Sequence, residues 1–491
     1  MKIIPALIVG AAVTVGGANA QTVLTRTLAE ELDRNFQILK QKTDPKPYFM
    51  SYEVTDVESD SIIAAHGSVD SQNHNRTRSL DVTVHVGSPE FDNYKKVLNV
   101  RPPRFTAGSP FTLDDSPAAI RQLAWQQTDG VYKAAAQRLT RIKSDLRVRV
   151  DESDHSGDFS LGGAHTSFTP RPANTFRPGD WSAKLRNASA DFAKYPNALG
   201  AMVRLQNELT HKTIVNTEGT QIEYPQQWTR IAVSAQAKAP DGMDLAAFEA
   251  FDAIDQASLP GEAQIRAAVN RVGSSLEALI KAPAADAFVG PAILSAKSAG
   301  VFFHEIFGHR IEGHRMKDEA EGQTFRHSVN TKILPDFLNV TFDPNLDRWE
   351  GQSLNGFYKF DDEGTAAKRV AVVQKGTLTS FLMSRTPVSG FPESNGHGRR
   401  SPGNEVVSRQ SNLIVESTNQ VNEKKLREML LEEIKRQGKP YGLFFETVTG
   451  GYTQTQAGGP QNFNVIPLVV YRVYADGRPD ELIRGVDIVG T

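Results

Sequence analysis

The sequence predicts an α+β fold in two domains, an α/β-containing N-terminal domain followed by a β-rich C-terminal domain. Amphipathic helix patterns flank strand-like runs in the first half, and short strand-like runs dominate the second half. The length of 491 residues exceeds the ~100–200 residues of one domain. Pro240-Asp241-Gly242 is a turn signal, so the expected division is residues 1–20, 21–240 and 241–491.

Two long helices and a set of strands are expected in the N-terminal domain. Apolar residues at helical spacing predict a helix over residues 24–40. Ser116 and Pro117 suit the start of a second helix that runs to Ile142. Residues 153–177, rich in Gly, Ser, Thr and Pro, are interpreted as a loop. Strand-like patterns cover residues 48–57, 61–69, 78–86, 202–205, 212–216, 220–224 and 231–235.

The C-terminal part combines few helices with many short strands. Residues 262–280 predict a helix, and residues 288–295 a buried strand that runs into a helix carrying two histidines. One further helix is expected over residues 422–437. Short strand-like runs cover residues 338–342, 369–375, 378–382, 412–416 and 467–474.

The first twenty residues have the features of a secretory signal peptide. Lys2 precedes an apolar run over residues 3–15, and Ala18-Asn19-Ala20 suits signal peptidase cleavage before Gln21. A membrane anchor is the alternative, but the apolar run falls short of the ~20 residues that span a bilayer. We therefore expect export to the periplasm, and no membrane insertion once the signal is removed.

Composition excludes several classes of function. With 55 basic and 57 acidic side chains, the chain has no net positive field that would attract nucleic acid. The sequence contains no cysteine, which excludes disulfides, catalytic thiolates and thiolate metal ligands within it.

The segment around His304, Glu305 and His309 contains the residue types that a zinc hydrolase uses. Such a site needs neutral imidazole ligands, an open coordination position and a carboxylate that acts as general base. Histidines five residues apart point about 140° away from each other on a regular helix. They can share a metal only if the helix bulges or ends near Gly308. The alternative is a histidine pair without metal, in which His309 and Arg310 complement a helix C-terminus.

The run His304-Glu305-Ile306-Phe307-Gly308-His309-Arg310-Ile311-Glu312-Gly313 resembles the H-E-x-x-G-H-x-x-E-G signature of the TldD/PmbA metallopeptidases, in particular their exported TldD-like subfamily. Shorter matches follow in the same order at residues 361–365, 374–378, 395–400 and 484–491. The resemblance implies a two-domain peptidase for short or unfolded peptides that assembles as a homo- or heterodimer. It also implies one Zn2+ per subunit, held by His304 and His309, with Glu305 activating the metal-bound water.

One departure concerns the third metal ligand, which in the family is a cysteine near the C-terminus. Because the sequence has no cysteine, we expect that it stops short of the natural end of the protein. His314 is the alternative ligand, although a surface or supporting position suits it better. Glu312 is expected to orient a histidine rather than to bind metal.

The other matching segments leave alternatives open. Arg399 and Arg400 could bind a peptide carboxylate or form ion pairs with nearby acids. The acidic turn Asp361-Asp362-Glu363 could support the site or be solvated, and His397 is expected to be a loop residue. Two rival functions are a catalytically silent peptide-binding partner subunit and a protein with a purely structural zinc.

Overall fold

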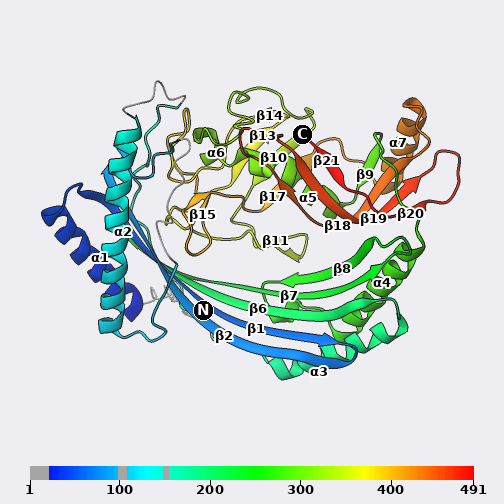
Figure 1. The fold of residues 1–491 in the computed structure, drawn as a ribbon, viewed down its shortest axis with the longest axis horizontal. Coiled ribbons are helices and arrows are strands. Elements are labelled where there is room, and N and C mark those ends of the chain that lie inside the picture. The colour runs from blue at the N-terminus through cyan, green and yellow to red at the C-terminus, as the bar shows by residue number, and fades with distance from the viewer. Residues whose placement is uncertain (1–20, 98–107, 147–153) are drawn as a thin grey trace, which may run out of the picture.

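The computed structural model describes residues 21–97, 108–146 and 154–491 (Figure 1). The predicted signal peptide, residues 1–20, lies outside the described residues. In the described part of the chain, no helix has both the length and the apolar character needed to cross a membrane. The fold is mixed α and β, as predicted.

The N-terminal domain is built on one large, strongly curved and mostly antiparallel sheet (Figure 1). Its strand order is β3-β2-β1-β6-β7, with β8 on the far side of β7 and two short strands, β4 and β5, at the margins. The strands are β1 (Pro47–Ala65), β2 (Ser68–Ser88), β3 (Phe91–Asp92), β4 (Ser109–Pro110), β5 (Thr166–Phe168), β6 (Leu199–Asn216), β7 (Gln221–Lys238) and β8 (Asp244–Ala253).

The first hairpin corrects the predicted strand boundaries. His66 and Gly67 have positive φ angles of 46° and 80°, which suit the tight turn of a two-residue hairpin. The turn therefore falls inside the run predicted as one strand over residues 61–69. The run predicted over residues 48–57 and the first part of the run over residues 61–69 join into the continuous strand β1.

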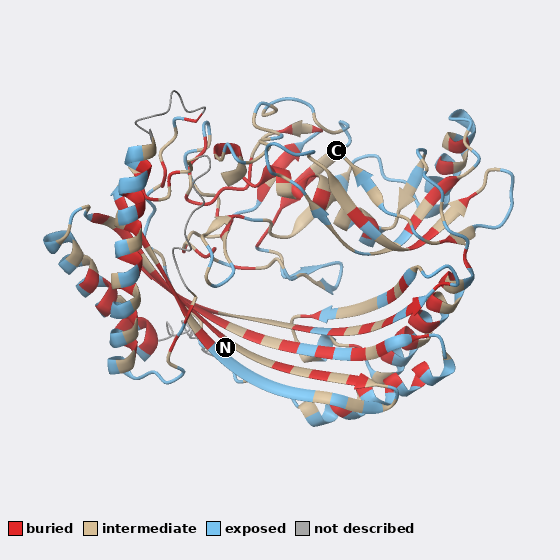
Figure 2. Cartoon of the chain, viewed as in Figure 1, coloured by how far each residue is buried: buried red, intermediate tan, exposed pale blue. Residues whose placement is uncertain are grey.

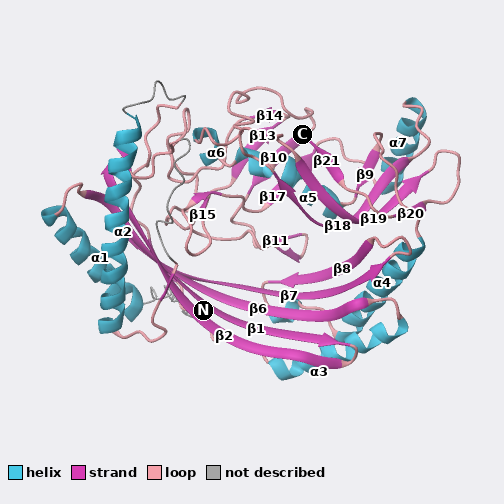
Figure 3. Cartoon of the chain, in the orientation of Figure 1, coloured by secondary structure: helices cyan, strands magenta, loops and turns pink. Residues whose placement is uncertain are grey.

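Helices cover the sheet at both ends and create two hydrophobic cores (Figures 2 and 3). At one end, α1 (Val23–Lys42) and α2 (Pro117–Leu146) enclose Leu28, Tyr52 and Leu139. At the other end, α3 (Pro178–Ser189), the 3-10 helix η1 (Ala190–Lys194) and α4 (Glu262–Lys281) enclose a second core that includes Phe192, Leu205 and Leu276. Helix α3 was not predicted.

The N-terminal domain extends beyond the predicted boundary at residue 240. The turn at Pro240-Asp241-Gly242 connects β7 and β8, which pair with each other in the same sheet. Helix α4 then packs its apolar face on that sheet. The N-terminal unit therefore runs to Lys281, because the turn links two strands of one sheet and not two domains.

The C-terminal domain contains two main sheets that support the histidine segment. Their strand orders are β14-β13-β10-β17 and β20-β19-β18-β9, with β21 also paired to β19. The elements are β9 (Ala292–Leu294), α5 (Ala296–Ile306), η3 (Gly308–Ile311), α6 (His314–Lys317), β10 (Leu338–Phe342), β11 (Arg348–Trp349), β12 (Gln352–Ser353), β13 (Val370–Gln374), β14 (Thr377–Leu378), β15 (Gly398–Arg399), β16 (Val407–Ser408), β17 (Leu413–Ser417), α7 (Glu423–Arg436), β18 (Gly442–Thr453), β19 (Phe463–Val473), β20 (Glu481–Ile483) and β21 (Ile488–Gly490).

A buried ion-pair network joins the two domains. Arg400 Nη2 lies 2.7 Å from Glu53 Oε2, and both side chains are 2% exposed. Lys212 Nζ lies 2.8 Å from Glu53 and 2.6 Å from Asp362. Of the two alternatives for Arg400, the contacts therefore support an ion pair. In the acidic turn, Asp361 and Asp362 are buried and Glu363 is half-buried. Asp362 belongs to the ion-pair network, and Asp361 Oδ1 accepts hydrogen bonds from the backbone N–H groups of Glu363 and Thr365.

Candidate metal centre

Helix α5 is anchored at its start and packed along β18. Ser295 Oγ caps the helix by accepting a hydrogen bond from Ser298 N, and its backbone N–H donates to Phe445 O of β18. Phe302 makes an edge contact with Phe463 of β19, at 5.7 Å between ring centroids. The helix therefore delivers His304 and Glu305 from its last turn to the face of this sheet.

The predicted helix break at Gly308 is confirmed. Helix α5 ends at Ile306, and a 3-10 turn begins at Gly308 and carries His309. The glycine is not required by a left-handed φ, as none is found there. A Cβ at Gly308 would instead clash with the side-chain amide of Gln410. The glycine thus allows a close approach of two segments 102 positions apart in the printed sequence.

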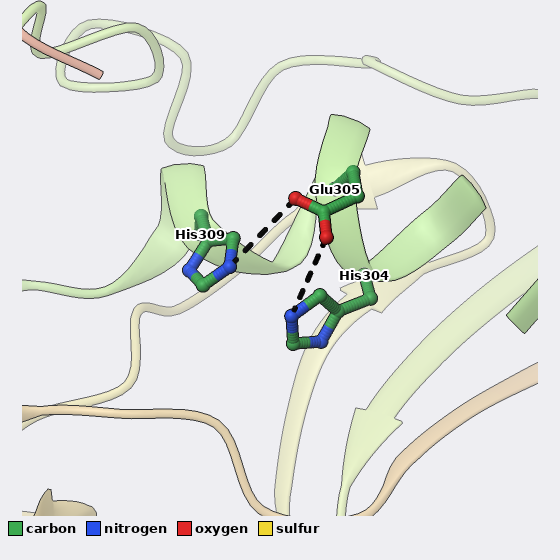
Figure 4. Close-up of side chains that lie close together, drawn as sticks. All are labelled: His304, Glu305 and His309. Atoms are coloured by element: carbon green, nitrogen blue, oxygen red, sulfur yellow. Dashed lines mark ion pairs between the residues drawn. The ribbon is translucent and has the colours of Figure 1, made fainter. Parts of the chain in front are cut away.

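The break brings His304, Glu305 and His309 together (Figure 4). One ligand atom from each side chain lies within 4.8 Å of the other two. Glu305 Oε1 is 3.9 Å from His304 Nε2, and Glu305 Oε2 is 3.9 Å from His309 Nε2. The two imidazole rings meet edge to face, with centroids 4.6 Å apart. The rings therefore converge, and do not point to opposite sides as on a regular helix.

Glu305 is held from behind by strand β18. Thr453 Oγ1 lies 2.7 Å from Glu305 Oε2 and 2.7 Å from the backbone oxygen of Glu305. The side chain of Glu305 packs against Gly451, where a Cβ would lie 2.7 Å from Glu305 Cγ and 2.5 Å from Asn464 O. The carboxylate is only 5% exposed, so these contacts fix its orientation.

His309 is oriented by the buried carboxylate of Glu312. His309 Nδ1 lies 3.1 Å from Glu312 Oε1, which leaves Nε2 directed at Glu305. Burial raises the pKa of Glu312, but its hydrogen bond with His309 and the nearby charges, among them Arg315, outweigh this and lower it overall. Glu312 contacts the ring nitrogen of His309 that is remote from Glu305, and a carboxylate in that place is typical of metal-binding histidines.

The side chains present fit a divalent transition metal. Burial, followed by the charge of His309, lowers the pKa of His304, which favours the neutral imidazole that a metal requires. The side chain of His304 is 44% exposed, so the site is open on one side. Imidazoles are borderline donors that zinc accepts, the carboxylate between them is placed to act as a base, and an open side is typical of catalytic zinc sites.

The remaining predicted residues lie outside this group. His314 does not belong to the group of close ligand atoms; burial lowers its pKa to about 3, and its Nδ1 has no hydrogen-bond partner. His397 is buried and contacts Asn395 and Ser411 through its two ring nitrogens. Arg399 Nε lies 3.3 Å from Asp362.

Three contributors to the centre were not predicted: Thr453, Gly451 and Gln410. Thr453 and Gly451 lie on β18, and Gln410 follows β16, so all three are more than 100 positions from Glu305 in sequence. None of them stands in a motif that indicates catalysis. They reach the centre only through tertiary packing.

The C-terminal domain is similar in sequence to known metallopeptidases. Residues 289–491 match the family model described as the PmbA/TldA metallopeptidase C-terminal domain. A protein of Archaeoglobus fulgidus named metalloprotease is 24% identical over 206 residues, which are 40% of this chain and 44% of that protein. A metalloprotease of Methanothermobacter thermautotrophicus is 25% identical over 385 residues, 74% of this chain and 78% of that protein.

A solved structure shows the same fold over nearly the whole chain. The crystal structure of TldE from Thermococcus kodakarensis superposes with a TM-score of 0.61 at 12% identity, covering 94% of this chain and 90% of that one. These similarities support membership of the TldD/PmbA metallopeptidase family, and the family model matches residues 289–491.

Proposed function

We propose that the protein hydrolyses peptide bonds in short or unfolded peptides with the help of one zinc ion per subunit. The observation that carries this proposal is the helix break, which brings two imidazoles and the intervening carboxylate within 4.8 Å of one another. His304 and His309 are the proposed metal ligands, and Glu305 is the proposed general base. The metalloprotease names of relatives support the same class of reaction.

When bound, zinc supplies Lewis acidity, which acidifies water to a pKa of about 7 and polarises the scissile carbonyl. The carboxylate of Glu305 accepts a proton from the attacking water and returns that proton to the leaving amine. Thr453 Oγ1 keeps the carboxylate in place during both transfers, because its hydroxyl can donate to Glu305 when it is ionised and accept from it when it is protonated. In the protonated case, the Thr453 hydroxyl donates to the backbone oxygen of Glu305.

Metal content and peptide hydrolysis, measured on the same preparations, test the proposal. Wild-type protein and Glu305→Ala are expected to bind zinc equally, while Glu305→Ala loses hydrolysis of an unstructured peptide. His304→Ala and His309→Ala are expected to lose both. Unchanged hydrolysis in Glu305→Ala would exclude Glu305 as the base, and bound metal without hydrolysis in the wild type would favour a structural zinc.

Assembly and location are also proposals. A dimer is proposed because of the sequence resemblance, and it predicts twice the monomer mass in light scattering. Export to the periplasm is proposed from residues 1–20 alone, and it predicts that mature protein recovered from the periplasm starts at Gln21.

A further inference from the structure

An open cavity of about 460 Å³ is lined in part by Arg409 and Gln410, which approach Glu312 and Gly308 beside the metal centre. It is lined by the loop before β13 and by the segment that contains β15 and β16. The two segments contribute Tyr358, Arg399, Arg400, Glu405, Arg409 and Gln410 to the lining. None of the residues proposed to bind metal or to act as base lines this cavity.

Arg399 lines the cavity, and one N–H group of its guanidinium has no hydrogen-bond acceptor in the described structure. Its guanidinium stacks on the Tyr358 ring at 4.2 Å, and its Nε lies 3.3 Å from Asp362 Oδ2. The Nη1 group is buried and has no hydrogen-bond partner. Because an unpaired buried donor on a charged group is costly, a ligand that accepts from Nη1 would be stabilised there.

Arg409 supplies a second cation on the side of the metal centre. Its Nε is 3.6 Å from Glu312 Oε1, beyond hydrogen-bond range, and 45% of its side chain is exposed. Glu312 is the same carboxylate that orients His309. Arg409 is therefore one side chain away from a proposed metal ligand, and its guanidinium is available to a bound peptide.

Gln410 links the cavity to the helix break. Both polar atoms of its side-chain amide are buried without a hydrogen-bond partner. The amide lies against Gly308, the residue before His309. It can accept from a peptide N–H and donate to a carbonyl or carboxylate oxygen.

The other charges in the cavity wall are already neutralised. Glu405 accepts from Lys96 Nζ at 2.8 and 3.0 Å through its two oxygens. Arg400 is paired with Glu53 at 2.7 Å. The groups left with unused capacity are therefore donors on Arg399 and Arg409, together with the Gln410 amide.

We propose that this cavity binds a carboxylate of the peptide substrate, next to the bond that the metal centre hydrolyses. The inference rests on the proposed function and adds a substrate class to it: peptides that place a negative charge beside the scissile bond. A planar carboxylate matches the fork of donors on a guanidinium, which a lone ammonium does not offer. Either the C-terminal carboxylate or an Asp or Glu side chain supplies this group.

Binding without turnover tests the proposal. The Glu305→Gln protein, loaded with zinc, is titrated with four fluorescein-labelled peptides of one neutral sequence. Two peptides differ only in having a free or an amidated C-terminus. The other two are both amidated and differ only in having Glu or Gln at one internal position. Anisotropy gives each Kd. We expect the free-acid or the Glu peptide to bind about tenfold more tightly than its neutral counterpart. The pair that shows the difference identifies the source of the carboxylate.

Substitutions in the Glu305→Gln background assign the effect to the cavity. Arg409→Gln is expected to reduce the preference to below about twofold, and Arg409→Lys to retain part of it. Arg369→Gln is the matched control, because Arg369 also makes a loose ion pair at 3.6 Å and is 58% exposed, but lies outside the cavity lining. The preference should survive in this control, and thermal unfolding should show that all the variants are folded.

Two results would overturn the inference. One is equal affinity for all four peptides, and the other is a preference that Arg409→Gln leaves unchanged. If the wild type hydrolyses peptides while either result holds, only the carboxylate site fails. If no peptide is hydrolysed, the proposed function fails whatever the binding data show.

Discussion

The hydroxyl of Thr453 lies 2.7 Å from Oε2 of Glu305, across an interface between the last turn of α5 and the end of β18. The same hydroxyl is 2.7 Å from the backbone oxygen of Glu305. A general base must keep its position while its charge changes, and this hydroxyl can serve both protonation states. Thr453 is thus a positioning residue for Glu305.

Replacing Thr453 by valine is expected to lower kcat by about tenfold with little change in KM, because the contact acts on the base and not on the peptide. Steady-state kinetics check this. Thr453→Ser keeps the hydroxyl and should recover most of the rate. A Thr453→Val enzyme with wild-type kcat would show that the hydrogen bond does not matter for catalysis.

Gly451→Ala should displace Glu305, since a Cβ there would come 2.7 Å from Glu305 Cγ and 2.5 Å from the backbone oxygen of Asn464. A displacement of this kind is expected to reduce kcat/KM by roughly 100-fold while zinc is retained. Gly450→Ala is the matched control, because a Cβ at Gly450 meets nothing within 4 Å. Equal losses in the two variants would point to a general effect on β18 and would contradict the specific contact.

Stability should fall as pH rises from about 4.5 to about 8 because of Glu363. Burial, and then the negative charge of Asp361, raise the pKa of this carboxyl to about 8, from an ordinary value of 4.5. A raised carboxyl pKa means that the folded state holds its proton more tightly than the unfolded chain. The protonated carboxyl of Glu363 therefore makes its full contribution to stability below pH 4.5, and this contribution is lost as pH rises to about 8. The loss is at most about 1.4 kcal/mol per pH unit.

Urea unfolding between pH 5 and 9 measures this dependence. Glu363→Gln should have a flatter profile than the wild type, and Glu416→Gln, which removes an exposed carboxyl, should not. Parallel profiles for the wild type and Glu363→Gln would rule out Glu363 as the source.

Those features of the metal centre that depend on residues close together in the sequence could be predicted. The five-residue spacing of His304 and His309 required a break near Gly308, and the structure has it. The reason for glycine at this position could not be predicted, because it is the approach of Gln410. The support from Thr453 likewise depends on which strand packs against α5, and no local pattern encodes that.

The difference between local patterns and long-range contacts also explains which parts of the fold could be predicted from the sequence. Helices with strong apolar periodicity, such as α1 and α4, were predicted to within two residues at each end. The acidic turn at residues 361–363 was left open between a supporting and a solvated role because charged residues are usually exposed. Asp362 is buried against Lys212 and the backbone N–H of Arg400, which come from other segments of the chain.

The most direct test of the account is to locate the metal. Crystals grown with zinc and measured on both sides of the zinc absorption edge should show one anomalous peak between the imidazoles of His304 and His309. The peak should lie about 2.0–2.1 Å from one nitrogen of each ring. A fully loaded protein with no peak between these rings, or with zinc bound only elsewhere, would contradict the assignment of this site.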